Sequence, residues 1–125
     1  MQKRTLIAAS ILGGLAVMIG AFGAHALKEM LEVSGRTETF ETAVKYQFYH
    51  ALTLLFIGLG KEKIESRFLN YAAISMITGT IIFSGSLYIL CLSGTTIWGA
   101  VTPVGGVLLI AGWVLMLLAI IKAFK

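Results

Sequence analysis

The stretch that decides the fold is TLIAASILGGLAVMIGAFGAHAL, residues 5–27, which contains no Asp, Glu, Lys or Arg. A helix that spans a bilayer needs about 20 mostly apolar residues, within a range of roughly 17–25. Three further stretches meet this requirement, although the second opens with Lys45, Gln47 and His50. The sequence therefore predicts four transmembrane helices, at residues 5–27, 43–60, 68–92 and 103–121.

The overall composition agrees with one membrane domain, residues 1–125. Of the 125 residues, 58% are hydrophobic and 13% are charged, whereas soluble domains average about 45–50% and about 25%. The net charge of +4 does not indicate nucleic-acid binding, because the basic residues lie at the ends of apolar stretches. Cys91 is the single cysteine, so no internal disulfide and no cysteine metal site can form. We expect an all-α, polytopic protein whose four helices form a compact bundle in the lipid bilayer.

The basic residues near these stretches predict the topology, because Lys and Arg concentrate in cytoplasmic loops. A cytoplasmic N-terminus places seven of them inside: Lys3, Arg4, Lys61, Lys63, Arg67, Lys122 and Lys125. It places three outside: Lys28, Arg36 and Lys45. Both termini are therefore expected in the cytoplasm. The first apolar stretch exceeds the roughly 7–15 residues of a signal-peptide core, so we expect it to remain as a helix.

The connection at residues 28–42 is the only long polar stretch. Leu27, Met30 and Leu31 recur there at roughly helical spacing among charges, which predicts a short amphipathic segment along the membrane surface. Ser34-Gly35 predicts a turn after it. From Thr39 onward, the second transmembrane helix is expected to begin.

Small residues at four-residue spacing predict close helix packing. Ser75 and Gly79 form such a stripe, and Gly105-Gly106 with Gly112 supplies small residues to the last helix. In lipid, helices associate by close backbone approach over such residues rather than by the hydrophobic effect. We therefore expect a tight bundle.

Strongly polar side chains inside a membrane are costly and need a partner or a function. With the predicted topology, all the candidates fall in the outer half of the bundle, and Tyr46, Gln47 and His50 can share one helix face. One hypothesis is an outward-opening, ligand-binding pocket; the other is a hydrogen-bond network that only fixes packing. The candidate site residues are His25, Tyr46, Gln47, His50, Ser84, Ser86, Tyr88 and Thr102.

Metal, haem and hydrolase chemistry are not favoured by this set. A tight metal site usually collects three or four ligands, and no Cys or carboxylate in the spans completes one around His25 and His50. A serine hydrolase built on Ser84 or Ser86 with His50 lacks an intramembrane acid. Proton-coupled transport usually leaves an Asp or Glu within the spans, and here there is none. We expect no cofactor, and a non-enzymatic role is favoured.

Four motifs resemble a known family. They are GAFGAHAL at residues 20–27, TAVKYQFYHAL at 42–52, FSGSLY at 83–88 and TPVGG at 102–106. In this order they are similar to the small bacterial membrane proteins catalogued as domain of unknown function 423, whose eukaryotic relatives include transmembrane protein 256. The resemblance covers nearly the whole chain. It implies a small multi-helix protein of the bacterial inner membrane, and it implies no particular chemistry.

Two functional hypotheses follow. The leading one is a membrane protein that binds or passes a small solute or lipid through the outer polar residues, as a homo-oligomer. The alternative is a structural or assembly factor of a larger membrane complex, in which the loop at residues 28–42 makes the essential contacts. A third class, a redox or lipid-modifying enzyme, predicts a copurifying chromophore or bound lipid substrate.

Overall fold

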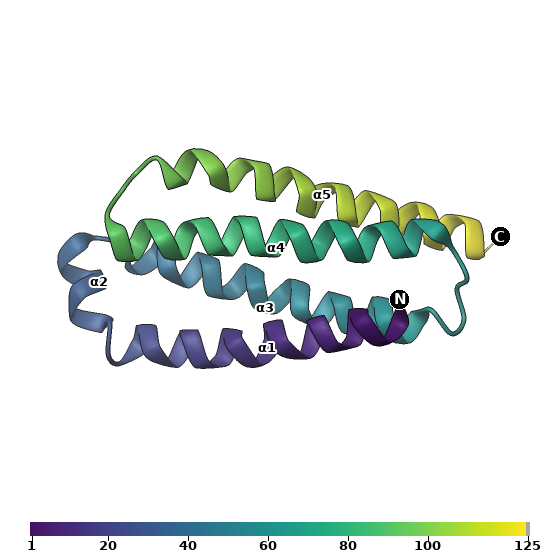
Figure 1. Cartoon of the computed structure of the whole chain (residues 1–125), viewed down its shortest axis with the longest axis horizontal. Helices are drawn as coiled ribbons and strands as arrows, with labels where there is room; N and C mark the ends of the chain where they lie inside the picture. The colour runs from purple at the N-terminus through teal and green to yellow at the C-terminus, as the bar shows by residue number, and fades with distance from the viewer. Residues whose placement is uncertain (125) are drawn as a thin grey trace.

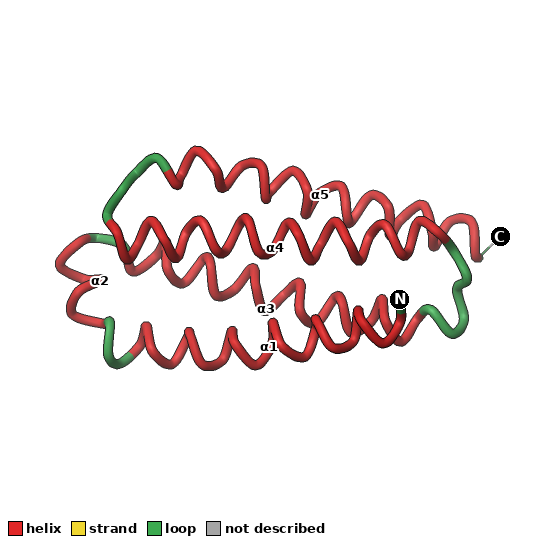
Figure 2. The backbone as a smooth tube through the Cα atoms, viewed as in Figure 1, coloured by secondary structure: helices red, strands yellow, loops and turns green. Residues whose placement is uncertain are grey.

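The computed structural model describes residues 1–124, which contain five α-helices and no strand. The four long helices lie side by side along the long axis, and a short helix crosses one end (Figure 1). Figure 2 shows that the connections between helices lie at the two ends of the molecule. The predicted all-α bundle is confirmed. The helices are α1 (Gln2–Ala24), α2 (Lys28–Ser34), α3 (Thr37–Gly60), α4 (Arg67–Ser93) and α5 (Trp98–Ala123).

Three of these helices, α1, α4 and α5, are long and apolar enough to cross a membrane. Helix α3 has 24 residues but is less apolar, because it carries Glu38, Glu41, Lys45 and His50. The first helix also ends at Ala24, three residues before the predicted boundary. It ends there because the Phe22 carbonyl oxygen accepts the N–H groups of both His25 and Leu27.

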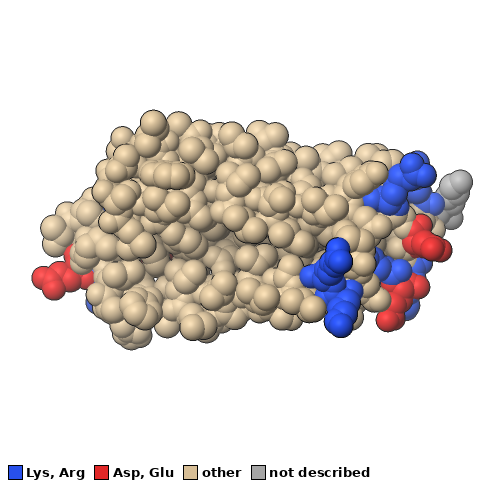
Figure 3. Space-filling model, in the orientation of Figure 1, with Lys and Arg blue, Asp and Glu red and all other residues tan. Residues whose placement is uncertain are grey.

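The long helices pack in series: α1 against α3, α3 against α4, and α4 against α5. The chain therefore forms two helical hairpins, α1 with α3 and α4 with α5, which meet between α3 and α4. The start of α1, the end of α5 and the loop at residues 61–66 share one end (Figure 1). Figure 3 shows the charged side chains near the two ends, with a broad uncharged surface between them. This distribution is what an apolar bilayer core requires.

The hairpin of α4 and α5 is held by glycines, as the small-residue stripes predict. A Cβ atom added at Gly105 would overlap the backbone of Phe83, and one added at Gly79 would lie 3.0 Å from the Leu109 nitrogen. This close approach lets the Ser75 hydroxyl donate to the Leu108 carbonyl oxygen across 2.6 Å. Backbone packing and an interhelical hydrogen bond thus act at the same interface.

Helix α2 closes the end of the bundle where α1 and α3 are joined. Its Leu31 is buried, and Gly35 after it has φ of 69°. That left-handed conformation suits glycine, which has no Cβ to clash. The predicted short helix and the turn at Ser34-Gly35 are therefore confirmed, and α3 begins at Thr37, close to the expected start.

Candidate functional site

Gln47 is a predicted site residue whose side chain bonds to two other helices. It is buried on α3, its Nε2 donates to the Leu12 carbonyl oxygen of α1 across 2.8 Å, and its Oε1 accepts from the Tyr88 hydroxyl of α4 across 2.6 Å. Because a carbonyl oxygen only accepts and a hydroxyl can donate, these partners fix the orientation of the amide. One side chain therefore joins three helices.

His50 lies one turn further along α3 and is also buried. Its Nδ1 lies 2.7 Å from the Tyr46 carbonyl oxygen, and its Nε2 lies 3.1 Å from Nε1 of Trp113 on α5. The carbonyl can only accept and the indole N–H can only donate, so Nδ1 carries the proton and Nε2 accepts. The imidazole is therefore neutral, and both of its nitrogens are used inside the protein.

The Tyr46 side chain takes part through its ring rather than its hydroxyl. The ring is half exposed and packs on Phe83 of α4, with centroids 5.0 Å apart. It also stacks near the His50 ring at 6.3 Å. Tyr46 therefore belongs to the contact between the two hairpins.

The predicted serines and threonine separate into two places. The buried Ser84 hydroxyl donates to the Ala43 carbonyl oxygen of α3 across 2.7 Å. Ser86 points instead to α5, where its hydroxyl lies 2.6 Å from that of Thr102. Ser84 therefore helps to join the two hairpins, while Ser86 and Thr102 join helices within one hairpin.

His25 does not join the other predicted residues. It is exposed at the C-terminal end of α1, and its side chain makes no hydrogen bond within residues 1–124. Within residues 1–124, His25 therefore makes no hydrogen bond to Gln47 or His50, and its part in a shared site stays a prediction. The helix ends at Ala24, so the chain has already turned outward at His25.

The two histidines do not form a set of ligands for a metal ion or a haem. In the described part of the chain, no three His, Cys, Asp or Glu residues gather in a way that could hold a metal ion. The Nε2 lone pair of His50 already accepts from Trp113, and His25 lies elsewhere. The donor set does not fit a shared bis-histidine site.

Sequence reasoning missed Trp113, the residue that links α5 to His50. An indole N–H in the middle of an apolar helix needs an acceptor, and that need was the available signal. The partner could not be read from the sequence, because it lies 63 positions away on another helix.

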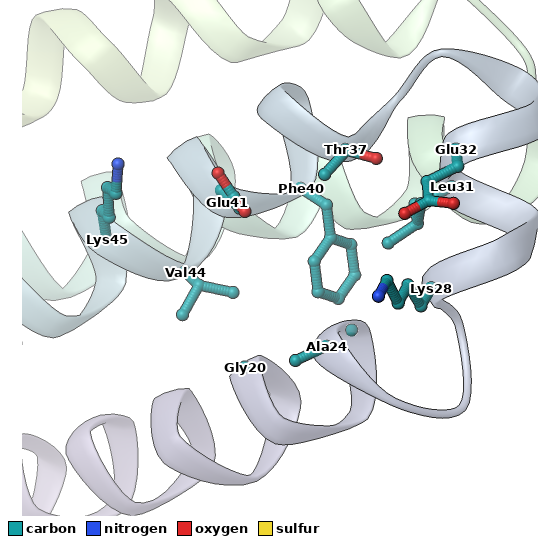
Figure 4. Close-up of a pocket in the computed structure, with 11 residues that line it drawn as sticks. Gly20, Ala24, Lys28, Leu31, Glu32, Thr37, Phe40, Glu41, Val44 and Lys45 are labelled. Carbon is teal, nitrogen blue, oxygen red and sulfur yellow. The ribbon is translucent and has the colours of Figure 1, made fainter.

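A cleft of about 670 Å³ opens between α1, α2 and α3, and none of the eight sequence-predicted site residues lines it. Figure 4 shows Gly20 and Ala24 of α1 on one side of it, Phe40 and Val44 of α3 on the other, and α2 at its end. The Phe40 ring packs directly on Gly23 and closes the seam between the two helices. The floor of the cleft is therefore made of small and apolar residues.

The rim of this cleft is charged. Lys28 and Glu32 come from α2, and Glu41 and Lys45 come from α3 (Figure 4). No ion pair within 4.0 Å forms among residues 1–124, and all four of these side chains are exposed. Thr37 also lines the cleft, and its buried Oγ1 has no hydrogen-bond partner in the same range.

At the opposite end of the bundle, a side-chain hydrogen bond links the residue after α3 to α1. The Lys61 ammonium group, just after α3, donates to the Thr5 hydroxyl of α1 across 2.9 Å. Partial burial lowers the pKa of Lys61. No sequence-predicted site residue lies at this end.

The fold and the site define a small all-α, multi-pass membrane protein whose polar residues gather toward the end covered by α2. Residues 19–106 match the model of the family described as "Protein of unknown function (DUF423)". The chain belongs to this family, as its motifs indicated. The matched range includes the whole cleft and all eight candidate residues, whereas Trp113 lies beyond it.

Relatives cover most of the chain. It is 40% identical to "UPF0382 inner membrane protein YgdD" of Escherichia coli K12, over 94% of this chain and 88% of that protein. It is 42% identical to "UPF0382 membrane protein" of Staphylococcus epidermidis ATCC 12228, over 97% and 98%. No solved structure matches. The chain is thus a multi-pass protein of the bacterial inner membrane.

Proposed function

We propose that α3 is a fourth transmembrane helix and that both termini face the cytoplasm. Its 24 residues span about 36 Å at 1.5 Å per residue, enough for a bilayer core of about 30 Å. It packs between α1 and α4, which shield its polar face. Gln47 and His50 on that face are satisfied by Leu12, Tyr88 and Trp113. The end that holds the termini also carries the larger share of Lys and Arg.

We further propose that this protein binds a lipid or small polar solute in the cleft between α1, α2 and α3. The observation that carries this proposal is the cleft itself: about 670 Å³, with an apolar floor and four charged groups that form no ion pair within residues 1–124. Sites of this kind combine an apolar lining with a few polar groups.

The hydrogen-bond network takes a structural role in this proposal. The Gln47 amide and both His50 nitrogens bond to protein groups, which leaves them little capacity for a ligand. Each interhelical bond in lipid contributes about 0.6–2 kcal/mol. The network would hold the two hairpins together, and the ligand would bind in the cleft.

Filling the cleft tests this function. Gly20 lines it, and a Cβ there would meet only Val44, at 3.2 Å. Gly20→Leu should therefore occupy the cleft, and Ala24→Leu does so from an exposed position on the same helix. Gly14→Leu is the control, because a Cβ at Gly14 meets nothing within 4 Å.

The readout is the set of lipids and small molecules that remain bound to the purified protein, measured by native mass spectrometry. Both cleft variants should lose molecules that the wild type and Gly14→Leu retain. If all four proteins carry the same molecules, or none, the cleft is not a binding site.

A structural or assembly role is the second candidate, and one observation favours it. Val33 of α2 is 84% exposed, the highest value among the large hydrophobic side chains of residues 1–124. An exposed apolar side chain on a surface helix can contact a partner protein. Under this alternative, Val33→Asp should remove a crosslink from α2 to a partner, and filling the cleft should have no effect.

A further inference from the structure

The cleft carries an unusual charge pattern. Helix α2 supplies Lys28 and Glu32, and α3 supplies Glu41 and Lys45, so each helix gives one positive and one negative group four residues apart. Such pairs commonly neutralise each other along a helix. Here neither pair lies within 4.0 Å. The cleft therefore offers two cationic and two anionic groups with a net charge of zero.

Lys45 is the group whose placement most needs an explanation. It lies at an exposed position more than two turns inside α3, and it forms no ion pair within residues 1–124. A lysine within a membrane segment is costly unless it meets a partner or serves a ligand. It lines the cleft, so a ligand bound there can supply the missing negative charge.

The charge pattern limits the class of ligand. A simple anion would compensate Lys28 and Lys45 but would lie near Glu32 and Glu41, and a simple cation would have the reverse problem. A molecule with one negative and one positive group compensates both. The cleft also has an apolar floor of Gly20, Phe40 and Val44, which indicates that part of the ligand is hydrocarbon.

We propose that the cleft binds a zwitterionic phospholipid whose headgroup carries a phosphate and a primary ammonium. A lysine of the cleft holds the phosphate, a glutamate holds the ammonium, and the apolar floor receives the first carbons of an acyl chain. The cleft lies at the end of the membrane helices, beside the surface helix α2, where headgroups are found. This inference rests on the proposed binding function and names its ligand.

The test is a binding titration of the full-length protein in detergent, followed by native mass spectrometry. The probes are dioleoyl phospholipids with ethanolamine, choline or glycerol headgroups, and soluble O-phosphoethanolamine. The ethanolamine lipid should bind about tenfold tighter than the choline lipid, because a trimethylated ammonium cannot donate hydrogen bonds to carboxylates. The glycerol lipid should bind more weakly than the ethanolamine lipid, because its headgroup has no cation for Glu32 and Glu41.

Two double variants separate the roles of the charges. Glu32→Gln with Glu41→Gln should abolish the preference for ethanolamine over choline. The matched control is Glu29→Gln with Glu38→Gln, which changes the same two helices outside the cleft and should keep the preference.

Lys28→Gln with Lys45→Gln should weaken the binding of all three phospholipids about tenfold, since each carries the phosphate. Lys3→Gln with Lys63→Gln, which lie outside this cleft, should leave it unchanged.

Each contrary result has its own meaning. In one such result, all three lipids bind equally well to the wild type and lose binding in Gly20→Leu. That result would overturn the zwitterionic ligand but keep the cleft as a binding site. Binding of O-phosphoethanolamine as tight as that of the lipid would overturn the phospholipid in favour of a soluble zwitterion. Binding that Gly20→Leu and Ala24→Leu leave intact would overturn the proposed function itself.

Discussion

The indole N–H of Trp113 donates to Nε2 of His50 across 3.1 Å, and this bond joins the last helix to the third. It makes the imidazole an acceptor at Nε2, while Nδ1 donates to the Tyr46 carbonyl oxygen. Because one nitrogen donates and the other accepts, the imidazole is neutral and fixed in one tautomer, and His50 serves the packing of the bundle. His50, which the sequence offers as a candidate for catalysis or metal binding, thus has both ring nitrogens engaged in hydrogen bonds within the protein.

Trp113→Phe should destabilise the folded protein by about 0.6–2 kcal/mol, because it removes the N–H donor and leaves His50 Nε2 without a partner. The measurement is thermal unfolding in detergent. Trp98→Phe is the control, since the Trp98 indole makes no side-chain hydrogen bond within residues 1–124. An equal change in both variants would mean that the His50 bond contributes nothing specific.

Gln47 and Tyr88 should be energetically coupled, because their 2.6 Å hydrogen bond joins the two hairpins. Gln47→Leu and Tyr88→Phe should each lower stability, and the double variant should lose less than the sum, by about 0.5–2 kcal/mol. A double-mutant cycle in detergent measures this difference. Pairing Gln47→Leu with Tyr71→Phe, whose ring is half exposed elsewhere on α4, should give additive effects. Additivity in both cycles would contradict the proposed link.

Gly105→Ala should be far more damaging than Gly106→Ala. The new methyl group at Gly105 would overlap the backbone of Phe83, whereas at Gly106 its nearest neighbour is 3.8 Å away. Overpacking of this kind costs about 1–3 kcal/mol, and a backbone obstacle cannot rotate away. The fraction of monodisperse protein after size-exclusion chromatography reports the difference. Similar yields of the two variants would contradict the close backbone contact between Gly105 of α5 and Phe83 of α4.

The topology predicts where an impermeant thiol reagent can react. In a Cys91→Ala background, Arg36→Cys at the α2 end should react in intact spheroplasts, because the proposed orientation places that end outside. Lys63→Cys should react only after the membrane is permeabilised, because the same orientation places the loop at residues 61–66 in the cytoplasm. The same accessibility at both positions, or the reverse, would overturn the orientation.

Much of the architecture could be predicted from residue order alone. Apolar runs bounded by charges predicted α1, α4 and α5 and their approximate lengths, because a bilayer leaves a backbone few other ways to satisfy its hydrogen bonds. The glycines of α5 and the stripe of Ser75 and Gly79 likewise indicated a tight interface, and that interface is present.

The sequence by itself determined the helices and the polar residues that lie among their apolar ones. Only the tertiary structure decided that Gln47 meets Leu12 and Tyr88, that His50 meets Trp113, and that His25 meets neither. Helical periodicity fixes which residues share a face of one helix, but not how neighbouring helices are rotated or shifted against it. The cleft of Lys28, Glu32, Glu41 and Lys45 arises from that relative placement, since its walls come from three separate helices.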